Sequence, residues 1–234
     1  MKRLFLSIFV ILTALSLSAW AQSLGTRQTF EKGISLANAE KFDAALVDFR
    51  KSLTLAESEE TDANFRARIH FNIGVCLYRL KENQQAVGEF EEAIKLSRGD
   101  YEKAFYALGM AQAELKNWDK SEQAFRGALR LNKRNGEAWF DLAFVYLAKN
   151  DFEAAKQAFQ KSVEYKSVSA AVGHNNLGVI FALGGDLNSA VREFETALRK
   201  SNGNFATAER NLQFCKSLGK NFNRESVAIL EFSK

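Results

Sequence analysis

AWFDLAFVYLAKNDFEAAKQAFQKSVEY, residues 138–165, contains the pattern that decides the fold of this chain. Its apolar residues recur at three- and four-residue spacing on both sides of Asn150-Asp151, which predicts two amphipathic helices joined by a short turn. Small residues at Ala143 and Ala155 let the two backbones approach closely, and Phe159 fills the space beside that contact. A single pair of this kind cannot bury its apolar face alone, so neighbouring pairs must stack on it.

The same columns recur five times along the chain. The anchor position is small in every copy, at intervals of 41, 35, 34 and 35 residues: Gly33, Gly74, Gly109, Ala143 and Gly178. Twelve residues later another small residue follows: Ala45, Ala86, Ser121, Ala155 and Ala190. Sixteen residues after the anchor the residue is always phenylalanine: Phe49, Phe90, Phe125, Phe159 and Phe194. Such regularity is the signature of a repeat protein.

These columns resemble the tetratricopeptide repeat (TPR), a helix–turn–helix unit of 34 residues. The resemblance covers about residues 26–204 and is closest in 138–165 and 174–198. It implies an all-α fold, a right-handed superhelical solenoid of five helix pairs closed by a C-terminal capping helix. The expected segments are a solenoid over 22–218, repeats at about 26–59, 67–100, 102–135, 136–169 and 171–204, a cap over 205–218, and a tail over 219–234.

The repeats depart from the family pattern at their ends and in the first copy. The chain has no proline, so we expect helices to stop at glycine and asparagine, as in Asn135-Gly136 and Asn202-Gly203. The first copy carries Lys32 where the other copies are apolar. Before the second copy, Thr61 or Asp62 is the candidate helix cap.

The first 21 residues have the pattern of an export signal. Lys2 and Arg3 precede an apolar run from Leu4 to Leu17, and Ala19 with Ala21 fits a signal-peptidase site that cuts after Ala21. No later apolar run is long enough to cross a bilayer. We therefore expect an exported protein, periplasmic or otherwise extracytoplasmic, without stable membrane insertion once the signal is removed; the alternative is an uncleaved anchor.

Composition argues against several functional classes. A net charge of +4 without a basic stripe gives no sign of nucleic-acid binding. His70 and His174 fall on the packing face of their helices, and no catalytic, metal-binding or phosphate-binding motif is present. We expect no enzyme activity, no cofactor and no metal. Cys76 and Cys215 are expected to be buried and free.

The resemblance implies that the first helix of each pair lines a concave groove, and there the inner columns are apolar. The predicted protein-binding residues are Phe71, Asn72, Val75, Tyr106, Met110, Phe140, Phe144, Asn175, Asn176 and Val179. Apolar residues in such a patch indicate a partner, and an asparagine can bond a peptide backbone as both donor and acceptor. We expect the ligand to be a peptide or an amphipathic helix of another protein.

The sequence thus predicts a non-catalytic interaction scaffold or assembly factor outside the cytoplasm. Two alternatives stay open. One is a self-associating structural protein, a homo-oligomer in which another copy fills the groove. The other is a non-catalytic subunit that positions an enzyme partner. The tail, 219–234, either folds back on the cap or binds a partner.

Overall fold

The computed structural model describes residues 24–166, 170–218 and 230–233, and all regular secondary structure in these ranges is helical. The expected export signal, 1–21, and most of the tail lie outside the described residues. The chain forms two compact units that meet at Leu115 and Lys116 in the sequence. This confirms the all-α repeat fold.

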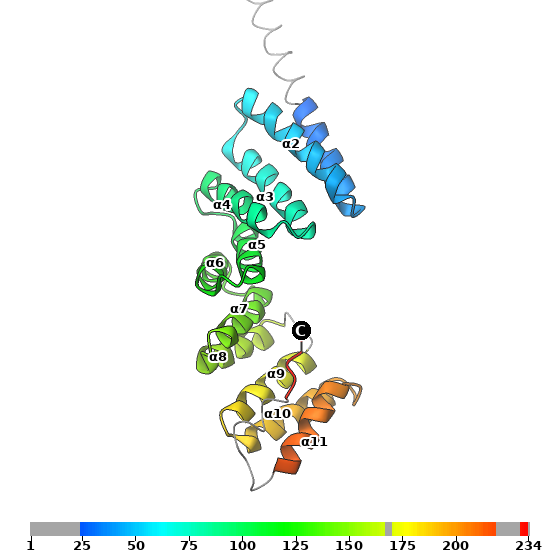
Figure 1. Ribbon diagram of the computed structural model, residues 1–234, viewed down its shortest axis with the longest axis vertical. Coiled ribbons are helices and arrows are strands. Elements are labelled where there is room, and N and C mark those ends of the chain that lie inside the picture. The colour runs from blue at the N-terminus through cyan, green and yellow to red at the C-terminus, as the bar shows by residue number, and fades with distance from the viewer. Residues whose placement is uncertain (1–23, 167–169, 219–229, 234) are drawn as a thin grey trace, which may run out of the picture. The chain divides into compact units, whose positions relative to one another are not determined.

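From residue 24 on, where the structure describes it, the first unit contains five helices, each packed against the next in sequence. They are residues 24–38, α2 (Phe42–Ser58), α3 (Ala63–Arg79), α4 (Asn83–Leu96) and α5 (Glu102–Glu114), coloured from blue to green in Figure 1. Helices α3 and α4 make the most extensive contact in this unit, and α3 also touches α5. The core is built around buried rings at Phe30, Phe49 and Phe90.

The described part of the second unit contains six helices and one short segment near the end of the chain. The helices are α6 (Trp118–Leu131), α7 (Gly136–Ala148), α8 (Phe152–Glu164), α9 (Ala170–Leu183), α10 (Leu187–Lys200) and α11 (Ala206–Leu218). Helix α7 pairs with α8 and α9 with α10, while α11 packs on α10 and α9. The tail segment, residues 230–233, runs beside α9 and is drawn in red in Figure 1.

A close glycine–phenylalanine contact joins the two helices of three pairs. A Cβ atom placed on Gly74 would lie 2.6 Å from Cε1 of Phe90, and one on Gly178 would lie 2.6 Å from Cε1 of Phe194. Gly33 has the same relation to Phe49, at 2.7 Å. Real Cβ atoms do not approach a ring this closely, so the anchor must be small because the ring occupies the space of its side chain. This confirms the prediction that the small anchor residue lets the two helices approach closely and that the phenylalanine fills the space beside the contact.

The expected helix stop at Asn202-Gly203 is confirmed, with φ of 53° and 78°, but most other helix ends differ from the expectation. Most described stops use a left-handed residue that is neither glycine nor asparagine: Glu40, Glu60, Lys81, Arg98, Lys116 and Lys166. At Lys81, with φ of 67°, the following N–H of Glu82 donates to the carbonyl of Leu77 at 2.8 Å, which closes the end of α3. The hydrogen bonds of this motif offset the steric cost of a left-handed side chain.

Two other helix boundaries involve side-chain caps. Asp62 caps α3 as predicted, since its carboxylate accepts hydrogen bonds from the backbone of Asn64 and Phe65. Asn135-Gly136 was wrongly predicted to be a helix stop. The side chain of Asn135 accepts from the N–H of Ala138 at 2.9 Å, and so it begins α7 rather than ending α6.

Lys32, the charged residue at an otherwise apolar position of the first copy, has an oppositely charged partner. Lys32 forms a 2.9 Å ion pair with Asp48, a buried carboxylate on α2. An unpaired buried carboxylate would be costly, so the lysine in an otherwise apolar column compensates for the acid opposite it.

Both cysteines are buried and free, as predicted. Burial raises the pKa of each thiol to about 11, so both stay protonated at neutral pH. In the described part of the chain, no helix combines the length and the apolar character needed to span a membrane.

The ring over Gly74 predicts opposite effects for the same substitution at two glycines of the first unit. Gly74→Ala forces a methyl group into the Phe90 ring, so we expect a loss of about 1 kcal/mol or more of unfolding free energy despite the better helix propensity of alanine. Gly88→Ala, in α4, meets nothing within 4 Å and should gain about 0.5–1 kcal/mol. Urea denaturation followed by circular dichroism measures both; equal effects would contradict the close contact.

Burial of the thiols predicts slow labelling. At pH 8 the native protein should react with Ellman's reagent far more slowly than the protein in denaturant, which exposes both of its 2 cysteines. Labelling of a native thiol at the rate of a free peptide cysteine would refute the burial.

The raised thiol pKa also predicts a pH dependence of stability. Unfolded thiols lose their protons near pH 8.5–9, whereas the folded ones hold theirs up to about pH 11. Their contribution to the unfolding free energy is therefore complete below about pH 8.5 and is lost as the pH rises to about 11. The double variant Cys76→Ala, Cys215→Ala should show a shallower alkaline fall in stability than the natural chain.

Candidate functional site

Three buried asparagines converge on the tail segment of the second unit. Asn175 and Asn176 are consecutive on α9 and are 0% exposed, and Asn211 comes from α11 and is 2% exposed. We call these three residues the asparagine triad. A buried carboxamide is costly unless its donor and acceptor are both bonded, so its partners show what this site is built to hold.

Asn211 and Asn176 each form hydrogen bonds to both the N–H and the C=O of one residue in the tail segment. Asn211 accepts from the N–H of Glu231 at 3.1 Å and donates to its carbonyl at 2.9 Å. Asn176 does the same at Ser233, at 2.8 Å for both bonds. Each carboxamide thus reproduces the paired bonds that one strand makes to another in an antiparallel sheet.

Asn175 connects these two contacts. Its amide nitrogen lies 3.1 Å from the carbonyl oxygen of Glu231 and 3.2 Å from the hydroxyl of Ser233. Its oxygen accepts a 2.9 Å bond from Asn211, which fixes the orientation of both side chains. The polar atoms of the asparagine triad are therefore satisfied largely by one another and by peptide backbone.

The tail segment presents alternate residues to opposite sides, as an extended chain does. Glu231 and Ser233 supply the backbone bonds, and Leu230 and Phe232 point into apolar surroundings. Leu230 is buried in a cluster with Val179 and Cys215. The side chain of Glu231 stays at the surface, where it forms an ion pair with Arg210.

An aromatic cluster receives Phe232. Its ring lies 6.2 Å from Phe159, nearly parallel to it, and 6.2 Å from Phe144, which it meets edge-on. Phe140 packs behind them, 5.1 Å from Phe144 and 5.7 Å from Phe159. Aromatic pairs at these separations add to the free energy of simple burial, which makes this cluster the principal apolar anchor of the site.

The structure brings the predicted site residues of the second unit together around the tail segment. Asn175, Asn176 and Phe144 contact it directly, and Val179 lies in the cluster that receives Leu230. Phe140 is only 8% exposed and serves mainly to support the rings in front of it.

The predicted residues of the first unit have different surroundings. Phe71 packs against Phe90 at 6.0 Å and Tyr101 at 5.1 Å, and Asn72 donates to the carbonyl of Arg68 in its own helix at 2.7 Å. The other three, Val75, Tyr106 and Met110, are half-buried on α3 and α5. A peptide-like contact comparable to the asparagine triad is not found among the described residues of this unit.

Sequence reasoning missed Asn211, and it left the tail open between folding back on the cap and binding a partner; in the structure the tail segment contacts α11, the expected cap, and α9. Asn211 follows Ala208 by three residues and precedes Cys215 by four, so it lies on the buried face of α11. A polar residue in the middle of an apolar face was the available signal. The tail segment carries no repeat that could have decided between its two expected roles.

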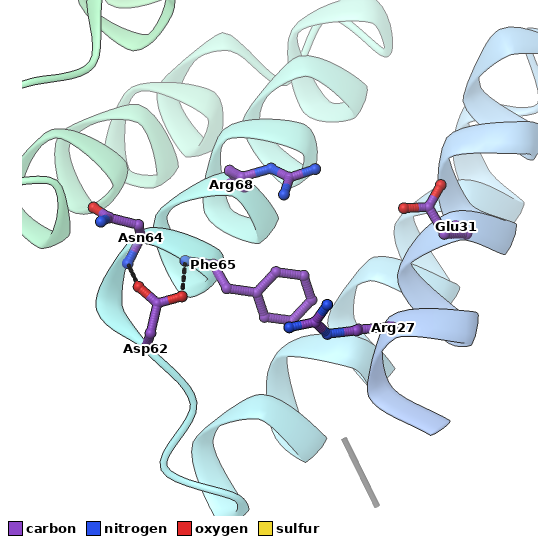
Figure 2. A pocket seen from close by; sticks show the side chains of 6 residues that line it. All are labelled: Arg27, Glu31, Asp62, Asn64, Phe65 and Arg68. Atoms are coloured by element: carbon purple, nitrogen blue, oxygen red, sulfur yellow. Dashed lines mark hydrogen bonds between the residues drawn. The ribbon is translucent and has the colours of Figure 1, made fainter. Parts of the chain in front are cut away.

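A small pocket of about 200 Å³ lies in the first unit between the helix of residues 24–38 and the start of α3 (Figure 2). The side chains of Asp62, Arg27 and Arg68 in its lining already have structural roles. Figure 2 shows the Asp62 carboxylate turned toward the backbone of α3, which it caps. The guanidinium of Arg27 lies 5.9 Å from the Phe65 ring, and that of Arg68 lies 5.2 Å from the Phe30 ring.

Both histidines form the same contact in different repeats. His70 Nδ1 lies 2.7 Å from a Glu89 carboxylate oxygen, and His174 Nδ1 lies 2.7 Å from Glu193. Each links the first helix of a pair to the second, so they are packing residues as expected. Across the ranges that the structure covers, no group of three or more His, Cys, Asp or Glu side chains is placed to hold a metal.

Comparison with known proteins agrees with this architecture. Family models described as tetratricopeptide repeat match residues 67–100, 112–172 and 145–205. The chain is a tetratricopeptide-repeat protein.

Solved TPR structures share its fold. MamA from Desulfovibrio magneticus RS-1 superposes with a TM-score of 0.66 at 18% identity, covering 77% of this chain and 97% of that one. YrrB, described as a TPR protein with an unusual peptide-binding site, gives a TM-score of 0.65 at 19% identity and covers 81% and 91%. Likeness at these identities concerns the fold alone.

Curated relatives are subunits of larger assemblies. Anaphase-promoting complex subunit 3 of Schizosaccharomyces pombe is 30% identical over 129 residues, 53% of this chain and 19% of that protein. Outer dynein arm-docking complex subunit 4 of Homo sapiens is 31% identical over 174 residues, 69% of this chain and 24% of that protein. The chain spans about a fifth of the length of these relatives. Fold and relatives together support a protein-binding scaffold.

The asparagine triad predicts a measurable loss of stability on truncation. Asn211→Ala leaves the N–H of Glu231 and the oxygen of Asn175 without their partner, and it removes one of the two hydrogen bonds to the Glu231 carbonyl, so we expect a loss of about 1–2 kcal/mol of unfolding free energy. The matched control is Gln213→Ala on the exposed face of the same helix, which should change it by less than about 0.5 kcal/mol. Urea denaturation compares the two, and a harmless Asn211→Ala would disprove the contact.

Proposed function

We propose that this TPR protein is a non-catalytic scaffold or assembly factor that acts outside the cytoplasm and binds an extended peptide segment of another protein. The binding site is the groove of the second unit, formed by the asparagine triad and the aromatic cluster. The observation that carries the proposal is the bonding of two carboxamides to both the N–H and the C=O of alternate backbone positions.

This bonding favours a peptide over an amphipathic helix as the ligand. In a helix, the N–H and C=O groups of interior residues bond to one another and are not available to a side chain. In an extended segment, every second residue presents both groups to the same side. The spacing of Asn211 and Asn176, which bond residues 231 and 233, matches that repeat.

The apolar part of the site gives the ligand its affinity. A side chain in the position of Phe232 contacts two rings, Phe144 and Phe159, and a side chain in the position of Leu230 enters a pocket beside Val179. Burying two such side chains contributes roughly 3–6 kcal/mol before entropy costs. With the backbone bonds, this suits a ligand of moderate affinity.

The location outside the cytoplasm rests on the first 21 residues, with their positive start, apolar run and small residues at Ala19 and Ala21. N-terminal sequencing of the protein from fractionated cells tests it. The expected result is a chain that begins at Gln22 in the extracytoplasmic fraction. A chain with an intact signal in the cytoplasmic fraction would refute this part of the proposal.

Photo-crosslinking in the native cell tests the binding site. A benzoylphenylalanine at position 144 should capture a defined partner, whereas the same group at Val47, an exposed position at 67% on α2, should not. Asn176→Ala should weaken capture at position 144 at least several-fold. Identical products at positions 144 and 47, or no effect of Asn176→Ala, would place the interaction elsewhere.

A further inference from the structure

We propose that the tail segment, Leu230-Glu-Phe-Ser233, is a built-in ligand of the second-unit groove, and that the partner peptide carries the same pattern of an apolar residue, any residue, an aromatic residue and a small polar residue. The inference rests on the proposed function, since it names the ligand class of the same site. The partner must displace the tail segment in order to bind.

The contacts of the tail segment are those of a ligand. Its polar bonds to the helices pass mainly through its backbone, at Glu231 and Ser233, and so do not depend on the identity of those residues. Its apolar contacts come from two side chains, Leu230 and Phe232. An extended peptide with these two side chains at the same spacing reproduces both the backbone bonds and the apolar contacts.

The site distinguishes its positions by chemistry. The first and third positions enter apolar surroundings, beside Val179 and against Phe159. The second position is exposed, because the Glu231 side chain reaches only Arg210 and both partners of that ion pair are more than half exposed. Surface ion pairs of this kind contribute little, so the second position is permissive. At the fourth position the hydroxyl of Ser233 meets the amide of Asn175.

A ligand in the same chain as its site has a concentration advantage. The tail segment follows α11, whose last residue is Leu218, by twelve positions. Such a tether gives a local concentration on the order of 1 mM, so a tail segment with an intrinsic Kd of about 100 µM would occupy the groove about nine-tenths of the time. A free peptide of equal intrinsic affinity then binds about tenfold more weakly to the complete chain than to a chain without the tail segment.

Fluorescence anisotropy tests this competition. The probe is a synthetic peptide with the sequence of residues 228–234 and a fluorophore at its N-terminus. It should bind a chain that ends at residue 229 about tenfold more tightly than it binds the complete chain. Because truncation can also disturb folding, the complete chain with Phe232→Asp provides a second open groove, and it should show the same gain.

Matched variants distinguish specific recognition of the peptide from nonspecific binding. In the truncated chain, Asn176→Ala should reduce probe affinity at least tenfold, whereas Arg210→Ala should change it by less than about threefold. In the probe, Phe232→Ala should abolish binding and Glu231→Ala should leave it within about threefold. Circular dichroism checks that each protein variant keeps its helical content.

The outcomes distinguish the two proposals. If neither open-groove protein binds the probe, the built-in ligand is refuted, even when crosslinking at position 144 still finds a partner. If the probe binds but crosslinking finds none, the inference about the groove stands and the proposed function fails. If the complete chain dimerises on sedimentation and the truncated chain does not, the tail segment acts between copies, which overturns its assignment as a ligand within one chain.

Discussion

The contact between a helix backbone without a side chain and a phenylalanine ring is the constraint on which the rest of the structure depends. At Gly74 and Gly178, the rings of Phe90 and Phe194 occupy the space where a Cβ would stand. This contact sets the distance and rotation of the two helices in a pair. The rotation turns the opposite face of the first helix away from its partner, and on α9 that face carries Asn175 and Asn176.

The repeat pattern predicted the fold well because it records this contact directly. Small and aromatic residues at fixed offsets are local constraints, and they identified the pairs as well as the buried thiols. The inner columns of the first helices, at other offsets, placed Phe144, Asn175 and Asn176 on the surface that now contacts the tail segment. The first-unit residues Phe71 and Asn72 share those columns but contact side chains and backbone of their own unit. A column gives a position on a helix, but not what lies opposite it.

The features that sequence reasoning missed depend on long-range or irregular contacts. The tail segment meets Asn175 across 56 residues of chain and has no periodicity that would indicate its place. Asn211 lies on the apolar face of α11, where a single polar residue indicates that a partner is needed but does not say which one. Several helix stops were mispredicted for a related reason, since at Lys81 the hydrogen bonds of the whole turn, rather than the residue type, determine the backbone conformation.

A binding site that recognises the main-chain N–H and C=O groups of its ligand leaves some of the ligand's side chains unconstrained. The side chain at the position of Glu231 touches only the surface, while its N–H and C=O are held by Asn211. Mutations at that position in a natural partner would hardly change its affinity for the groove, whereas the flanking apolar positions would be under purifying selection. In the partners of this protein, sequence variability should therefore alternate along the bound segment, with every second residue free to vary.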